Sequence, residues 1–253
     1  MAQRVAITAA CGGFGLVVAR AFAAGGAEVR TCDADQAAVA AASASGLSAA
    51  HVDVGDGEAL EGWVDGVLSD LGGLDVLINN AGIAGPTAMV EDVEPAEWER
   101  CLAVDLTSHY RSCARVVPVM KAAGAGSIIN VSSTAGQMGM GMRSPYAAAK
   151  WGVIGLTKSL AIECGPHNVR VNAICPGSVD GDRMRRVIAR EAAARAASVE
   201  AVEREYLAGQ SISRFVSPTE VADLCLFLAS DAARMISGQA IAVDGHTETF
   251  HIG

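Results

Sequence analysis

The sequence contains few aromatic residues and no long apolar run. Aromatic residues make up only 4% of the 253 residues, although hydrophobic residues make up 51%. Charged residues interrupt each apolar segment before it reaches the roughly 18 residues that a membrane-spanning helix requires. The amino-terminal segment lacks the charged, apolar and small-residue zones of a secretory signal peptide. We therefore expect a soluble, cytoplasmic protein with an aliphatic core.

Paired cysteines and basic clusters are also absent. The seven cysteines are dispersed and never form a Cys-x-x-Cys pair, so we expect neither a disulfide framework nor a metal site. The net charge is −9 at pH 7, and no basic run contains interleaved aromatic residues. This charge disfavours nucleic acid and anionic membranes as partners. A small-molecule substrate remains the expected partner.

Seven short apolar runs alternate with longer segments of helical periodicity. The predicted strands are Val5–Thr8, Glu28–Cys32, Ala49–Val52, Val76–Asn79, Ser127–Val131, Arg170–Ile174 and Gln239–Val243. Helical segments between them include Gly15–Ala24, Ala59–Leu71, Pro95–Lys121 and Tyr146–Glu163. This alternation predicts an α/β fold of the Rossmann type, with a doubly wound, seven-stranded parallel sheet and helices on both faces.

One segment departs from this alternation. The stretch Met184–Leu207 is rich in Ala, Arg and Glu, which favours helix, yet it stands where a strand is due. No linker or internal repeat divides the chain, so we predict a single domain over residues 1–253. Within it, residues 178–215 form a helical excursion that can act as a lid over a ligand.

A glycine-rich turn follows the first predicted strand. It reads Thr-Ala-Ala-Cys-Gly-Gly-Phe-Gly over residues 8–15 and leads directly into a helix. Small residues at such a turn let backbone N–H groups and the positive end of the helix approach a pyrophosphate. A glycine-rich turn alone is as often only a tight connection between a strand and a helix. Other residues of the chain are therefore needed to distinguish a phosphate-binding turn from a structural one.

The ends of the next strands supply polar residues where open α/β sheets bind ligands. Asp33 ends the second strand, eighteen residues beyond Gly15, where a carboxylate can accept hydrogen bonds from an adenosine ribose. The next residue, Ala34, offers no cation for the extra phosphate of NADP, which favours NAD. The alternative for Asp33 is a solvated carboxylate at a strand end. Asn79 and Asn80 end the fourth strand. Two adjacent amide side chains there are typical of a site where the backbone passes close to a cofactor, although they can also simply cap a turn.

The most informative group is Ser133, Tyr146 and Lys150. Tyr146 and Lys150 are four residues apart, so they share one face of the predicted helix. An ammonium beside a phenol favours the phenolate, which lowers the pKa of the tyrosine and makes it a usable proton donor or acceptor. Ser133, at the end of the fifth strand, can hydrogen-bond a substrate oxygen. An isolated Tyr-x-x-x-Lys is usually a helix-surface pattern. Here it follows a glycine-rich dinucleotide turn and a carboxylate suited to a ribose, and this order along the chain is the one expected when all of them line a single cleft.

Taken together, these motifs resemble the short-chain dehydrogenase/reductase family over essentially the whole chain. Asn-Ala-Ile-Cys-Pro-Gly at residues 172–177 resembles the family's nicotinamide-side strand end, and residues 237–245 resemble its carboxyl-terminal strand. The resemblance implies that Tyr146 is the general acid/base, that Ser133 polarises the substrate oxygen, and that Lys150 assists Tyr146 and holds the nicotinamide ribose. It implies direct hydride transfer and a homotetramer. The implied NAD contacts are Ala9, Gly12, Gly13, Phe14, Gly15, Asp33, Asp53, Val54, Asn80, Ala81, Gly82, Tyr146, Lys150, Pro176, Gly177 and Val179.

The chain departs from the family pattern at several positions. Ala9 replaces the first glycine of the turn, and we expect cofactor binding to survive the added methyl group. Asp105 stands where the family has a fourth catalytic residue, normally Asn. A carboxylate cannot donate as an amide does, so Asp105 either accepts a hydrogen bond and holds Lys150 charged or impairs turnover; we expect activity to continue. Gly181 replaces a common Thr, and His246 replaces a glycine.

Arginines gather in the segments expected to line the substrate pocket. Arg143 and Arg183 are candidates to clamp a carboxylate or sulfonate, which suggests a sugar acid or another anionic hydroxy compound. Surface salt bridges with Glu191 and its neighbours explain the same arginines equally well. An acyl thioester or steroid substrate also stays open. The rival function is a catalytically impaired NAD-binding sensor or scaffold, suggested by Asp105 and Ala9.

Overall fold

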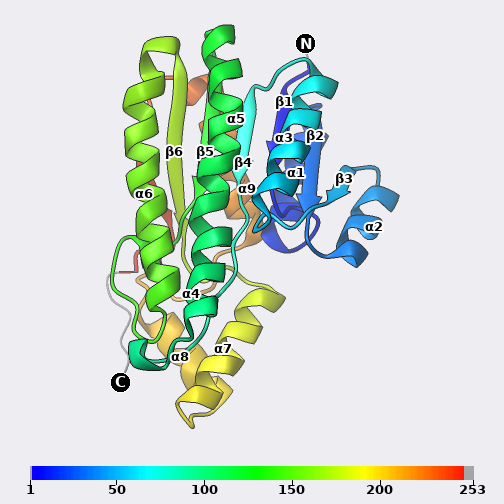
Figure 1. Ribbon diagram of the computed structural model, residues 1–253. Helices are drawn as coiled ribbons and strands as arrows, with labels where there is room; N and C mark the ends of the chain where they lie inside the picture. Colours follow the sequence, from blue (N-terminus) through cyan, green and yellow to red (C-terminus); the bar gives the residue numbers. More distant parts are fainter. Residues whose placement is uncertain (1, 248–253) are drawn as a thin grey trace.

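A seven-stranded parallel sheet forms the centre of the protein (Figure 1). The computed structural model describes residues 2–247. The strand order is β3-β2-β1-β4-β5-β6-β7, so the direction of winding changes between β1 and β4. The strands are β1 (Arg4–Ile7), β2 (Glu28–Asp33), β3 (Ser48–His51), β4 (Val76–Asn79), β5 (Gly126–Val131), β6 (Val169–Pro176) and β7 (Ala240–Val243). The predicted fold is confirmed, and each predicted strand overlaps one of these.

Helices cover both faces of the sheet. They are α1 (Gly13–Ala24), α2 (Gln36–Ala44), α3 (Gly57–Leu71), α4 (Pro95–Leu102), α5 (Ser108–Ala123), α6 (Ser144–Cys164), α7 (Asp182–Ala194), α8 (Val199–Ala208) and α9 (Pro218–Ala229). One apolar core joins α1 and α9 to the sheet, and a second core joins α3 and α5 to its other face. Strands buried on both faces need continuous apolar sequence, as in β4, whose four residues are all buried.

The predicted helical segment Pro95–Lys121 is helical throughout, but it is not one regular α-helix. A π-helical turn (η2, Ala103–Thr107) separates α4 from α5. Such turns add a residue to the helix and occur often at functional sites. Here the turn contains Asp105, whose carboxylate oxygen Oδ1 accepts a hydrogen bond from the Ile83 backbone N–H at 2.6 Å. Helical periodicity alone does not reveal this insertion, and the turn brings Asp105 into contact with the β4–α4 loop.

The predicted helical excursion between β6 and β7 contains α7 and α8, drawn in yellow in Figure 1. These two helices pack on each other through a small apolar core of their own, formed by Ile188, Ala192, Val202 and Tyr206. The excursion therefore forms a separate helical pair beyond the carboxyl ends of the strands (Figure 1), and the bridge Val179↔Val216 closes its base.

Within residues 2–247, no helix is long and apolar enough to cross a membrane. No group of three or more His, Cys, Asp or Glu side chains in that range can hold a metal ion. All seven cysteines are free and buried, as expected for small core residues.

Candidate active site

The glycine-rich turn forms an open cradle at the start of α1. Gly12 caps the helix without any side chain, and a Cβ built on Gly12 or Gly13 would meet no atom within 4 Å. Gly13 has a φ of +54°, which favours glycine. The free N–H groups of the first helical turn therefore border open space large enough for a phosphate group.

Ala9 occupies the left-handed region at the beginning of this turn. Its φ is +51°, a conformation that costs an L-residue with a Cβ about 1 kcal/mol. His246, which also replaces a family glycine, has a φ of +65°. At both positions the backbone therefore keeps a left-handed conformation that glycine favours. The Cβ of Ala9 and of His246 makes that conformation sterically unfavourable.

Replacing Ala9 by glycine should stabilise the fold. The Ala9→Gly variant relieves the left-handed strain, and we expect the free energy of unfolding to rise by about 0.5–1 kcal/mol, since the greater freedom of glycine in the unfolded chain offsets part of the gain. Urea denaturation measures the change. The control is Ala41→Gly in the exposed middle of α2, which should destabilise by about 1 kcal/mol. Equal destabilisation by both variants would contradict the strain at Ala9.

Asn80 binds the end of β4 to the glycine-rich turn. Its side-chain Nδ2 donates hydrogen bonds to the carbonyls of Thr8 (3.0 Å) and Ala9 (2.7 Å). A Cβ on Gly15 would lie 2.5 Å from this Nδ2, so only glycine fits there. The other amide atom, Oδ1, is buried and accepts no hydrogen bond within the described part of the chain. It is an acceptor ready for a hydroxyl donor on a bound molecule.

Asp33 lies at the far end of the same cavity. Its carboxylate accepts hydrogen bonds from the backbone N–H groups of Cys11 (3.2 Å) and Asp35 (3.1 Å). These bonds fix the carboxylate at the end of β2, and Asp35 and Ala38 line the cavity beside it. The cavity is therefore anionic at this end.

Ser133, Tyr146 and Lys150 come together as the motif predicts. Ser133 lies two residues after β5 and is 9% exposed, and its Oγ accepts a hydrogen bond from the Ala135 N–H at 3.1 Å. Lys150 is buried; its Nζ donates to the Val131 carbonyl at 3.0 Å and lies 5.7 Å from the centre of the Tyr146 ring. Tyr146 is half-buried and lines the cavity. The three side chains therefore face one space from β5 and α6.

Asp105 lies directly behind this group. It is 0% exposed, and a Cβ on Gly82 would lie 3.2 Å from Lys150 Nζ and 3.4 Å from Asp105 Oδ1, so both charged groups lie close to Gly82. Burial raises the pKa of the Asp105 carboxyl above its usual range, while the positive charge of Lys150 and the Ile83 N–H oppose that rise. Lys150 and Asp105 are not in direct ionic contact in the described structure.

The arginines divide into two groups. Arg185 pairs with Asp180 and Asp182, and Arg195 pairs with Glu191 and Glu205, as the surface explanation predicts. The second group faces the cavity. Arg143, Arg183 and Arg186 line it, and Arg183 donates to the Gly82 carbonyl at 2.7 Å.

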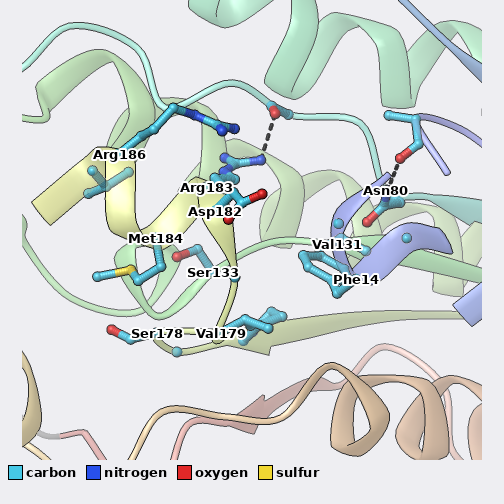
Figure 2. Close-up of a pocket in the computed structure, with 18 of the residues that line it drawn as sticks. Phe14, Asn80, Val131, Ser133, Ser178, Val179, Asp182, Arg183, Met184 and Arg186 are labelled. Atoms are coloured by element: carbon cyan, nitrogen blue, oxygen red, sulfur yellow. Dashed lines mark hydrogen bonds between the residues drawn. The ribbon is translucent and has the colours of Figure 1, made fainter. Parts of the chain in front are cut away.

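The glycine-rich turn, Asp33, Asn80, the Ser133, Tyr146 and Lys150 group and the second group of arginines border one cavity of about 530 Å³. Figure 2 shows Phe14 and Asn80 at one end and Met184 and Arg186 at the other, with Ser133 between them. The predicted site residues that line it are Ala9, Gly12, Gly13, Phe14, Gly15, Asp33, Asn80, Gly82, Ser133, Arg143, Tyr146, Lys150, Pro176, Gly177, Val179 and Arg183.

Four predicted site residues do not line the cavity. Asp53 forms an ion pair with Arg100 at 2.8 Å, and Val54 is buried in the core beside α3. Ala81 donates its backbone N–H to Thr8 Oγ1 at 3.1 Å, and Asp105 lies behind Gly82. None of these four residues lines the cavity in this structure.

Other lining residues were not singled out from the sequence. Tyr206 from α8 is the largest of them, and its hydroxyl donates to Glu191 Oε2 at 2.7 Å. It lies sixty residues after Tyr146 in an Ala/Glu-rich helix, where no local motif distinguishes it from a packing residue.

Asn79, in contrast, is not at the cavity: it is 1% exposed and its Nδ2 donates to Asn130 Oδ1 at 2.8 Å.

Comparisons with known proteins agree with this arrangement. A family profile described as enoyl-(acyl carrier protein) reductase matches residues 9–246. The chain is 42% identical over 196 residues to trans-4-hydroxycyclohexanecarboxylate dehydrogenase of Sinomonas cyclohexanicum, covering 77% of this chain and 68% of the relative. It is 36% identical over 246 residues to D-beta-hydroxybutyrate dehydrogenase of Cupriavidus necator, covering 94% and 95%.

A solved structure extends the agreement to three dimensions. The crystal structure of NAD+-bound xylitol dehydrogenase superposes with a TM-score of 0.92 at 29% identity, covering 96% of this chain and 98% of that one. The relatives are oxidoreductases that act on hydroxyl or carbonyl groups. With the Ser133, Tyr146 and Lys150 geometry and the matching sheet, the chain belongs to the short-chain dehydrogenase/reductase family.

Proposed function

We propose that this protein is an NAD-dependent dehydrogenase/reductase that transfers a hydride between NAD(H) and the carbinol or carbonyl carbon of a small anionic hydroxy compound. One observation carries the proposal. A single cavity contains a glycine cradle and Asp33 at one end, and Ser133, Tyr146 and Lys150 with cavity-facing arginines at the other.

The cavity fits a dinucleotide. The open space over Gly12 and Gly13 suits its pyrophosphate, and the buried Oδ1 of Asn80 is an acceptor without a donor among the described residues. Asp33 suits the adenosine ribose, and Pro176, Gly177 and Val179 suit the nicotinamide end. Bound NAD(H) would supply the hydride acceptor or donor.

The preference for NAD over NADP rests on charge. The cationic residues that line the cavity, Arg143, Lys150, Arg183 and Arg186, belong to the catalytic end, whereas Asp33 and Asp35 line the other. A 2′-phosphate beside two carboxylates would be repelled and would find no guanidinium there.

Changing this charge should change the cofactor. In the double variant Asp33→Ser, Ala34→Arg, we expect the ratio of NADPH to NADH affinity to rise by about 100-fold, because a repulsive carboxylate is lost and a phosphate-binding guanidinium is gained. Fluorescence titration of both reduced cofactors measures the ratio. The control Asp56→Ser removes a carboxylate at the start of α3, outside the cavity. An unchanged ratio in the double variant would exclude Asp33 from the ribose site.

The chain's own residues then supply the proton chemistry. Tyr146 exchanges a proton with the substrate oxygen as the carbinol and carbonyl interconvert, and Ser133 Oγ hydrogen-bonds that oxygen. Lys150, buried on the same helix face, stabilises the negative charge that develops on the phenol oxygen and donates toward the cofactor ribose. Asp105 lies close to Lys150 at Gly82 and has nearly the shape of the Asn that it replaces, which supports continued activity.

Two observations support an anionic substrate. Arg143 and Arg183 line the catalytic end of the cavity, and both curated relatives above are named for hydroxycarboxylates. Met184 and Val187 of α7 and Tyr206 of α8 cover this end. We propose that residues 178–215 form a lid that closes on the substrate and excludes water.

We also propose a homotetramer. Tyr110 on α5 and Trp151 and Ile162 on α6 are large apolar side chains that remain exposed in the single chain. The family resemblance also implies carboxyl-terminal contacts between subunits, but the last residues of the chain, 248–253, lie outside the described residues.

The test combines binding and turnover. Thermal shift with NAD, NADH, NADP and NADPH identifies the cofactor, and absorbance of the reduced nicotinamide follows reactions with sugar acids, polyols, hydroxy acids and ketones. Stabilisation by NAD(H) with turnover of one compound class supports the dehydrogenase. NAD(H) binding without turnover, both in the native protein and in Asp105→Asn, would favour the non-catalytic sensor. If only Asp105→Asn turned over, Asp105 would be shown to disable the native site.

A further inference from the structure

The catalytic end of the cavity contains a buried cation without a matching anion. The Arg143 side chain lies at the start of α6 and is only 4% exposed. Its Nη2 donates to the Ala84 carbonyl at 2.7 Å, and its Nε is buried with no acceptor in the described structure. A buried guanidinium that retains an unused N–H loses hydration without full compensation.

No carboxylate in the described residues neutralises Arg143. Asp105 is the buried carboxylate nearby, but it already accepts a hydrogen bond from the Ile83 N–H. It also interacts electrostatically with three cations, Lys150, Arg183 and Arg143, so its one charge cannot balance Arg143 alone. Glu191 of the lid is already bound by Arg195 and by the Tyr206 hydroxyl.

The two remaining acids at this end of the cavity are on or beside the lid. Asp180 and Asp182 are exposed and pair with Arg185. The catalytic end therefore has more positive than negative charge, and the excess lies at a buried position.

Arg143 also lies against the proposed catalytic tyrosine. Its guanidinium carbon lies 5.2 Å from the centre of the Tyr146 ring. Arg183 and Arg186 are exposed on α7, where solvent screens their charge, and one Arg183 N–H is already bound to Gly82. Burial makes an ion pair with Arg143 stronger than one with either lid arginine.

We infer that Arg143 is the anion receptor of the substrate site, and that it selects short hydroxycarboxylates whose carboxylate lies within a few bonds of the reacting carbon. This inference rests on the proposed function, and it specifies the substrate class and the residue that recognises its carboxylate. The carboxylate supplies the missing acceptor for Nε and neutralises the buried charge. Its place beside Tyr146 then positions the carbinol at the catalytic oxygen. The lid arginines contribute a weaker, screened attraction.

The experiment compares each acid with its uncharged amide, which has nearly the same shape. Short 2-, 3- and 4-hydroxy acids and their primary amides are assayed with NAD, and the ratio of kcat/KM for acid over amide is taken. We expect Arg143→Gln to lower this ratio by about 100-fold and Arg143→Lys, which keeps the charge but not the planar fork, by about tenfold. Arg183→Gln should lower it by less than about tenfold.

The matched control is Arg190→Gln, which removes the same charge from an exposed position of α7 outside the cavity and should leave the ratio within about twofold. An Arg143→Gln variant that loses acid and amide turnover equally would overturn the inference, as would an Arg183→Gln variant with the larger effect.

A binding measurement separates this inference from the dehydrogenase assignment. The thermal shift of the NADH-saturated protein is recorded with butyrate and with butyramide. Greater stabilisation by butyrate that disappears in Arg143→Gln supports the receptor even if no alcohol in the panel reacts, in which case the proposed reaction and not the receptor is in question. Equal shifts with butyrate and butyramide in the native protein would reject the receptor.

Discussion

Tyr146→Phe should reduce kcat by about 1000-fold while the protein keeps its fold and its affinity for NADH. The variant loses only the phenol oxygen of a residue that lines the cavity together with Ser133 and Lys150. Without it, no group at this position exchanges a proton with the substrate oxygen. Steady-state kinetics measures the loss, and NADH fluorescence measures cofactor binding.

The chain offers a matched control. Tyr110 is 58% exposed on α5 and does not line the cavity, so Tyr110→Phe removes the same atom outside the site and should leave kcat within about twofold. A Tyr146→Phe variant that kept most of its activity would mean that another group transfers the proton. Loss of NADH binding would show instead that the substitution disturbs the cofactor site.

Acid should weaken the fold through His109. This histidine is fully buried behind the end of β4, where its Nε2 bonds to the Ala81 carbonyl at 3.3 Å and its Nδ1 has no partner in the described structure. Burial, with the nearby positive charge of Lys150, lowers the pKa of His109 to about 3 from the usual 6.5. Between these values the unfolded chain binds a proton that the folded chain excludes. The stability that neutral His109 provides is therefore complete above pH 6.5 and is lost progressively as the pH falls toward 3.

The expected loss from this residue is about 2 kcal/mol of unfolding free energy between pH 7 and pH 5. Urea denaturation of the native protein and of His109→Gln across this range isolates it, because the difference between the two curves cancels the titration of other groups. Among these is Asp105, whose raised pKa acts in the opposite direction. The exposed His167, replaced in the same way, should change the pH dependence by less than about 0.5 kcal/mol. Parallel curves for the native protein and His109→Gln would show that His109 takes up a proton in the fold.

Local sequence determined much of this protein. Buried parallel strands need continuous apolar runs, and a glycine-rich turn needs residues that tolerate its backbone, so the sheet, the cradle and Asp33 were predictable from short segments. The spacing of Tyr146 and Lys150 was also sufficient to predict that their side chains lie together, because residues four apart on a helix share a face. The helical character of the excursion followed from its composition.

Other features depend on contacts between distant segments, and the tertiary structure alone decided them. The π turn at Asp105 forms against the loop of Ile83, and Asp53 pairs with Arg100 outside the cavity. The sequence placed Arg143 and Arg183 together as equal candidates, whereas the fold buries Arg143 and leaves Arg183 exposed. Tyr206 reaches the cavity because α8 packs on α7. Burial and charge pairing are properties of the assembled chain, and the strength of each interaction depends on how much water the rest of the fold excludes.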